Sequence, residues 1–152
     1  MDQIWRKFIL RLHNCLVWLW NQEGTPAKRA RGLGVGVFSG CFPLFGLQTI
    51  LGMILARVFR GNKLLAAIAT WVSNPITYLP LYLFNYQVGC KLLGDDQYLF
   101  KFNQINGNDL WNQGTIILNR LFLGSLVVGV IFGLTTAILS YLSLKLIEQK
   151  KN

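Results

Sequence analysis

Charged residues are scarce in this chain of 152 residues: they make up 14% of it, against 53% hydrophobic residues. Soluble domains carry about 25% charged residues, because a surface that faces water needs them. Three long segments, residues 32–56, 64–90 and 121–144, hold no Asp, Glu, Lys or Arg at all. Uncharged apolar segments longer than ~18 residues are typical of membrane helices. The sequence therefore predicts an all-α integral membrane protein and excludes a disordered chain.

Histidine is rare, and acidic residues are missing from the apolar segments. His13 is the only histidine, and no acidic residue lies within the three apolar segments. No intramembrane carboxylate is therefore present to act as a general base, relay a proton or bind a metal ion. The glycine-rich stretch 32–40 lacks the Lys-Ser/Thr ending of a phosphate-binding loop, so we interpret it as a face for close helix packing. We predict no catalytic residue, no metal site, no cofactor and no enzymatic activity.

Cysteine and acidic charge are sparse too. Cys15, Cys41 and Cys90 are spaced too widely for a disulfide framework or a zinc site, and we interpret them as small buried side chains. The net charge is +9, but the basic residues sit at the edges of the apolar segments. Basic residues at such edges anchor membrane helices and set their orientation. Nucleic-acid binding is therefore not predicted.

Residues 1–27 are predicted to form an amphipathic interfacial helix and a linker. Basic residues interrupt this stretch, so it is not expected to be a cleavable signal sequence. A helix packed on the body of the protein is the alternative to one in the headgroup layer. The apolar residues recur at spacings of three and four, which is one face of a helix: Ile4, Phe8, Leu12, Cys15, Leu16 and Leu19.

Proline interrupts two of the three apolar segments. A helix that runs into Pro43 should kink or stop there, because proline lacks a backbone donor and clashes with the preceding turn. The second segment is broken by Asn74-Pro75 and again by Pro80. Asn is a favoured helix N-cap and Pro a favoured first helical residue, so a new half-helix is predicted to begin at Asn74.

The third apolar segment, 121–144, contains no proline and is predicted to be a plain transmembrane helix, with Gly129 and Gly133 spaced for close helix contact. The predicted membrane domain covers residues 28–144. It includes a polar loop, 91–120, and is followed by a basic tail, 145–152.

Both ends of the chain are basic, which favours placing both in the cytoplasm. In the preferred topology the N-terminus is cytoplasmic, segment 32–56 enters and returns as a re-entrant hairpin, and the next two segments cross. In the alternative, both broken segments are re-entrant and the C-terminus lies outside.

The two breaks are the candidate binding site. Irregular backbone at membrane depth survives only where protein or a polar cavity satisfies it, and helix ends inside the bilayer can bind anionic groups. In the competing interpretation the polar side chains satisfy only the broken backbone. The candidate substrate-binding residues are Pro43, Gly46, Gln48, Thr49, Ser73, Asn74, Pro75, Thr77, Pro80 and Tyr82. Lys28, Arg29 and Arg31 are predicted to attract lipid headgroups.

Two ordered motifs cover the breaks: Gly36, Phe38, Gly40, Pro43, Gly46, Gln48 and Thr49, then Ser73, Asn74, Pro75, Thr77, Pro80 and Tyr82. In these motifs the chain resembles the bacterial membrane protein family called domain of unknown function 2062, over residues 28–144. The resemblance implies a bacterial multi-pass membrane protein but no particular reaction.

Two functions remain open from the sequence. The first is a transporter or lipid-handling protein of the cytoplasmic membrane, with a polar site at the bilayer midplane between the two broken helices. The second is a non-catalytic membrane scaffold or accessory subunit, in which the breaks are structural. Membrane lipids are expected partners, and a membrane protein partner is possible. We also expect a homo-oligomer, since three apolar segments can hardly surround a polar break on all sides.

Overall fold

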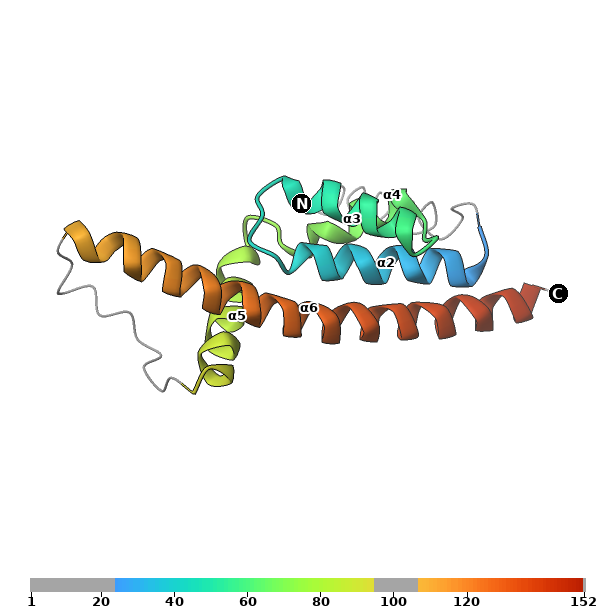
Figure 1. Cartoon of the computed structure of the whole chain (residues 1–152). Coiled ribbons are helices and arrows are strands. Elements are labelled where there is room, and N and C mark those ends of the chain that lie inside the picture. The colour runs from blue at the N-terminus through green and yellow to red at the C-terminus, as the bar shows by residue number, and fades with distance from the viewer. Residues whose placement is uncertain (1–23, 95–106, 152) are drawn as a thin grey trace, which may run out of the picture.

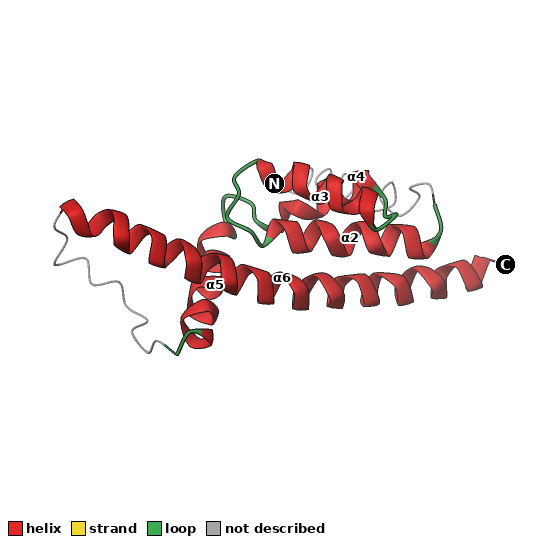
Figure 2. Ribbon diagram, in the orientation of Figure 1, coloured by secondary structure: helices red, strands yellow, loops and turns green. Residues whose placement is uncertain are grey.

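The computed structural model describes residues 24–94 and 107–151, and every secondary-structure element in these two ranges is helical (Figure 2). The all-α prediction is confirmed for them. The predicted interfacial helix falls largely on residues 1–23, which lie outside the described residues. The elements are α2 (Pro26–Gly40), α3 (Leu47–Val58), α4 (Lys63–Ala69), the 3₁₀ helix η1 (Thr70–Val72), α5 (Tyr78–Leu92) and α6 (Gly107–Lys151) (Figure 1).

Local chemistry sets where the first helices begin. The Thr25 side chain accepts a hydrogen bond from a backbone N–H in the first turn of α2, and Pro26 occupies the first position, where no N–H is needed. The Asn62 side chain caps α4 through two N–H groups, at 2.9 and 3.1 Å. Gly46 precedes α3 with a φ of 77°, a conformation that glycine adopts without strain.

Helices α2 and α3 form a hairpin that returns to the end where it started. The turn between α3 and α4 lies against the first turn of α2, where the Asn62 N–H donates to Lys28 O at 2.9 Å. A Cβ added to Gly61 would stand 2.8 Å from the backbone nitrogen of Gly32, so only glycine allows this approach. The apolar segment 32–56 therefore folds back near its middle (Figure 1).

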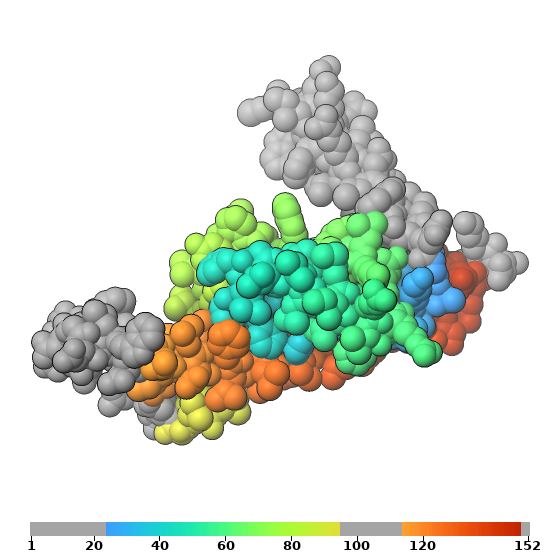
Figure 3. All heavy atoms as spheres, turned by 45° about the horizontal axis from the view of Figure 1, so that its top comes forward, coloured from blue at the N-terminus to red at the C-terminus, as the bar shows by residue number. Residues whose placement is uncertain are grey.

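Glycines let α2 pack closely on α4 and on α6. A Cβ at Gly36 would stand 2.6 Å from the Cβ of Ala69 in α4, and a Cβ at Gly133 would stand 2.8 Å from Gly34 O. Gly129 likewise lies against the α2 backbone. The predicted close-packing role of these glycines is confirmed. Figure 3 shows α3 and α4 covering one face of the molecule, with α6 emerging beneath them.

Helix α5 crosses α6 at a steep angle (Figure 1). The two backbones approach closely at Gly89 and Gly124, where a Cβ on either residue would overlap the backbone of the other helix. Apolar segment 64–90 therefore does not form one straight helix. It comprises α4 and η1, which run beside α2, and α5, which leaves in a different direction.

Helix α6 is uninterrupted over 45 residues, and the prediction of one plain helix through 121–144 is confirmed. The helix is longer than expected at both ends. Residues 107–120, assigned to a polar loop, and residues 145–151, assigned to a tail, are helical. No proline occurs beyond residue 80, and extending a helix is far easier than starting one. Polar residues alone therefore do not end it.

Helix α6 has the features of a membrane-crossing helix. Its Gly114–Gln149 part is long and apolar enough to span a bilayer, and it is the one such helix found in residues 24–94 and 107–151. Only 28% of its most apolar window is buried, whereas the core helix of a soluble domain would be mostly buried. Large apolar side chains are also exposed elsewhere, including Phe45, Trp71 and Ile76 at 73%, 74% and 85%. Such a surface is typical of contact with a membrane or with another protein.

Candidate functional site

The first helix break covers residues 41–46. Helix α2 ends at Gly40, and the Cys41 N–H bonds back to Phe38 O at 3.2 Å. The predicted stop near Pro43 is present, with the last helical residue three positions before the proline. The residue directly before a proline, here Phe42, is disfavoured in helical geometry. The next helix begins at Leu47 rather than at Pro43. Gly46, at the start of α3, is exposed.

The second break covers residues 73–77. Asn74 Oδ1 accepts hydrogen bonds from the second and third N–H groups that follow it, at 2.9 and 3.1 Å, which are the bonds of an N-cap. This capped turn starts at Asn74-Pro75 as predicted, but α5 itself begins only at Tyr78. The prediction of a further break at Pro80 is wrong. Pro80 lies in the first turn of α5, where helical N–H groups have no partner to lose.

Folding joins the two breaks. Ser73 Oγ donates a hydrogen bond to Gln48 Oε1 at 3.1 Å, and the hydroxyl groups of Thr49 and Thr70 are 3.1 Å apart. These bonds connect the first turn of α3 with the end of the α4–η1 run. The polar residues that the sequence assigned to one site thus come together from two segments.

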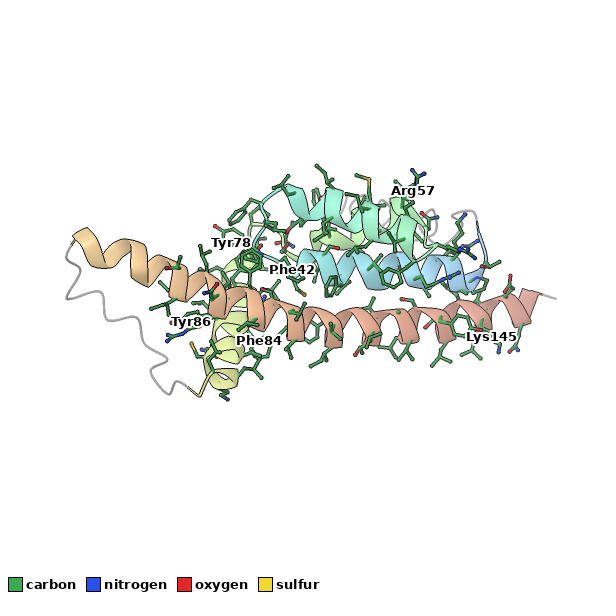
Figure 4. The ribbon with its side chains drawn as sticks, in the orientation of Figure 1. Phe42, Arg57, Tyr78, Phe84, Tyr86 and Lys145 are labelled. Atoms are coloured by element: carbon green, nitrogen blue, oxygen red, sulfur yellow. The ribbon has the colours of Figure 1, made fainter. Side chains whose placement is uncertain are left out.

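Aromatic residues close the junction on one side. Tyr82 OH donates to Phe42 O at 3.2 Å, and the ring of Phe45 meets the rings of Tyr78 and Tyr82 edge to face, at 5.8 and 6.0 Å. Figure 4 shows Tyr78 and Phe42 near each other at this end of α2. Tyr82 therefore links α5 to the first break.

Some polar groups of the joined breaks remain free. Thr77 Oγ1 donates to Val72 O at 2.6 Å and so satisfies the broken backbone. By contrast, Gln48 Nε2 and Asn74 Nδ2 donate no hydrogen bond to any part of the chain that the structure describes. Both side chains are half-buried. Two amide groups can therefore donate to an acceptor that comes from outside.

Asn85 belongs to the same region, and the sequence reasoning missed it. Its side chain is fully buried, and its Nδ2 donates to Cys41 O at 2.8 Å and to Ser125 Oγ at 2.9 Å. The contact ties the first break to α5 and α6. Asn85 Oδ1 is buried with no partner within residues 24–94 and 107–151. The available signal was an amide side chain within an uncharged apolar segment, which demands a partner.

The predicted headgroup residues lie away from the breaks. Lys28, Arg29 and Arg31 occupy the first two turns of α2, and the rise from Arg31 to the end of α2 is about 14 Å. Figure 4 places Arg57 and Lys145 toward the same end of the molecule. The structure therefore separates a basic end from the joined breaks, with uncharged helix between them.

The described residues offer little for redox or metal chemistry. Cys41 and Cys90 are free and buried. No three His, Cys, Asp or Glu residues come together within residues 24–94 and 107–151. The arrangement at the breaks therefore presents hydrogen-bond donors and acceptors of neutral side chains.

A family model matches nearly the whole chain, residues 10–152, and its description is "Uncharacterized protein conserved in bacteria (DUF2062)". This match confirms the resemblance seen in the two motifs. No curated protein and no solved structure shows significant similarity to the chain.

Proposed function

The chain belongs to the bacterial family DUF2062 (domain of unknown function 2062), and we propose that it is a multi-pass protein of the bacterial cytoplasmic membrane that handles lipids. Its working site is the pair of joined breaks. The single observation that carries this proposal is the pair of free amide groups, on Gln48 and Asn74, in surroundings of exposed apolar side chains.

The depth of the breaks supports a site inside the bilayer. If the basic residues near the start of α2 lie at the headgroups, the end of α2 is about 14 Å below Arg31. That is close to half of the ~30 Å hydrocarbon core. The exposed Phe45, Trp71 and Ile76 around the breaks suit contact with acyl chains. Free amide N–H groups at this depth have no water to bond to, so they can donate hydrogen bonds to the ester or phosphate oxygens of a lipid.

The course of the chain supports the preferred topology. The α2–α3 hairpin returns to its starting end, as a re-entrant hairpin would, and the start of α2 lies at the same end as the C-terminus of α6 (Figure 1). Helix α4 leads from this end to the breaks, and α5 continues from them at a steep angle to α6 (Figure 1). We infer that the chain reaches the far side after α5 and that α6 crosses back. With the basic end in the cytoplasm, both termini are cytoplasmic. A reporter protein that is active only in the cytoplasm should therefore be active when it is fused after Lys151.

The test removes a donor while keeping the local fold. Asn74→Ser keeps a side-chain oxygen that can cap the turn but lacks the amide N–H groups. The readout is lipid exchange between the two leaflets of liposomes that contain the purified protein. It is measured as the rate at which a fluorescent phospholipid of the inner leaflet becomes accessible to a quencher added outside. The wild-type protein should accelerate this exchange, and Asn74→Ser should lose most of it. The melting temperature of the variant should be unchanged.

Gln149→Ser is the matched control, because Gln149 is an exposed amide residue near the C-terminal end of α6, which is the end away from the joined breaks (Figure 1). It should behave like the wild-type protein. Two results would contradict the proposal: no lipid exchange or lipid binding by the wild-type protein, or full exchange by Asn74→Ser.

A scaffold or accessory subunit is the second candidate, and one observation favours it. Most polar side chains of the breaks bond within the chain, as Ser73 does with Gln48 and Thr77 with Val72 O, which is what a purely structural turn requires. In that case the protein should copurify with a stoichiometric membrane partner. Asn74→Ser should then affect assembly rather than lipid exchange.

The proposal assigns no catalysis, and it includes self-association. Most large apolar side chains between residues 114 and 149 of α6 are exposed, and a second copy would cover part of this surface and enclose the breaks. Cross-linking in native membranes should yield dimers or larger species. Monomers alone would count against this part.

A further inference from the structure

A groove lies between α2, α3 and α6, on a different part of the molecule from the joined breaks. Its volume is about 450 Å³, within the ~300–1,000 Å³ typical of small-ligand pockets. The lining includes the glycines at which α2 and α6 meet, Gly34 and Gly133, and the apolar side chains Phe38 and Leu55. Among the residues that the structure describes, Arg31 is the one charged residue that lines it.

Arg31 is positioned to bind an anion. Its side chain is exposed, and Nε donates to Ala27 O at 3.1 Å. The terminal nitrogens have no partner in the described ranges, 24–94 and 107–151. A guanidinium group held in this way offers parallel N–H groups that match two oxygens of a phosphate. Lys28, one turn earlier in α2, adds positive charge.

The groove runs from this charge into the apolar part of the molecule. Arg31 and Phe38, which both line it, are seven residues apart on α2, a rise of about 10 Å. Because α2 and α6 are antiparallel (Figure 1), Ala137 lines the groove toward the basic end and Gly129 toward the breaks. A cation at one end and apolar walls beyond it complement an anionic lipid.

We propose that this groove binds one acyl chain of an anionic phospholipid from the cytoplasmic leaflet, with the lipid phosphate on Arg31. The inference rests on the membrane location in the proposed function, but it does not depend on the joined breaks. An anionic lipid held here stands beside the α2–α3 hairpin, whose tip carries the first of the two joined breaks, and thus at an entry to them from the cytoplasmic side.

The experiment measures lipid binding to purified full-length protein in detergent, by titration with phosphatidylglycerol or phosphatidylcholine. Native mass spectrometry counts the bound lipids. The wild-type protein should bind phosphatidylglycerol more tightly than phosphatidylcholine. Arg31→Gln should weaken phosphatidylglycerol binding about tenfold or more, because it removes a charge-assisted contact. It should weaken phosphatidylcholine binding less, because the choline cation of that lipid offsets the negative charge of its phosphate.

Two further variants make the result specific. Val130→Trp fills the groove from an exposed position of α6 and should reduce binding of both lipids. Lys63→Gln removes an exposed basic residue at the same end that does not line the groove, and it should bind like the wild-type protein. Equal binding of the two lipids by the wild-type protein would overturn the inference, as would an unaffected Arg31→Gln variant.

A third outcome would identify a different occupant. If Val130→Trp abolishes dimers and leaves lipid binding intact, the groove holds a second copy of the chain, and the inference is wrong. The joined breaks are tested separately by lipid exchange in Asn74→Ser. If Asn74→Ser loses lipid exchange while Arg31→Gln binds phosphatidylglycerol as the wild-type protein does, this inference is refuted and the proposed function stands.

Discussion

Gly36 offers the sharpest test of the packing on which the joined breaks depend. It lies on the face of α2 that contacts α4, and a Cβ there would overlap Ala66 O and stand 2.6 Å from the Cβ of Ala69. The obstacles are backbone and Cβ atoms, which have no rotamer to escape into. Gly36→Ala can therefore be accommodated only if α2 and α4 move apart.

The size of the effect follows from that displacement. Carbon atoms pack at ~3.5–4.0 Å, so the two helices must separate by about 1 Å. Overpacking of this kind costs ~1–3 kcal/mol. We expect the upper half of that range, because Gly32 and Gly40 approach the same neighbouring layer one turn to either side. For a chain of this size the melting temperature should fall by about 4–10 °C.

Gly114→Ala is the matched control, because it makes the same chemical change in α6, where nothing lies within 4 Å of the added Cβ. Alanine is better than glycine inside a helix by ~0.5–1 kcal/mol, so this variant should melt at a higher temperature. Thermal unfolding of the purified protein, followed by tryptophan fluorescence, compares the two. If Gly36→Ala melts at or above the wild-type temperature, the close contact of α2 and α4 is refuted.

Two further predictions concern the joined breaks. Gly46→Ala should lower the free energy of unfolding by ~1–2 kcal/mol through backbone strain alone, because its φ is 77° while a Cβ there meets no atom within 4 Å. Chemical denaturation measures this free energy, and an unchanged value would contradict the prediction. Ser73→Ala and Gln48→Leu should show a coupling energy of about 0.6 kcal/mol, up to ~1.7, in a double-mutant cycle, as hydrogen bonds between membrane helices do; strictly additive effects would argue against the bond between them.

Much of the region around the breaks could be predicted from the sequence, because the features involved are local. Pro43 and Asn74-Pro75 disrupt or start helices through their own backbone chemistry, wherever the rest of the chain lies. The glycines at 32–40 and in α6 predict close helix contact, but they do not predict which helix is contacted. The break predicted at Pro80 was wrong, because a proline interrupts a helix only beyond the first turn of that helix. The start of α5 at Tyr78 depends on the preceding turn.

Other parts of the site could not be predicted from local signals. Asn85 signals only that an amide in an apolar segment needs a partner, and packing brings Cys41 O and Ser125 Oγ to it from positions 44 and 40 residues away. The groove beside Arg31 exists only because α2, α3 and α6 leave space between them. The length of α6 was also missed, since polar residues 107–120 are compatible with either a loop or a helix.

The amino-acid sequence by itself determined that this chain suits a membrane and that two of its apolar segments stop partway. Charge-free length and proline position decide these features residue by residue, without reference to distant contacts. Only the tertiary structure decided that the two breaks meet and that the amide groups of Gln48 and Asn74 stay free. Which donors find partners depends on how close α2 can approach α4 and α6, and that distance is a property of packed helices rather than of any one segment.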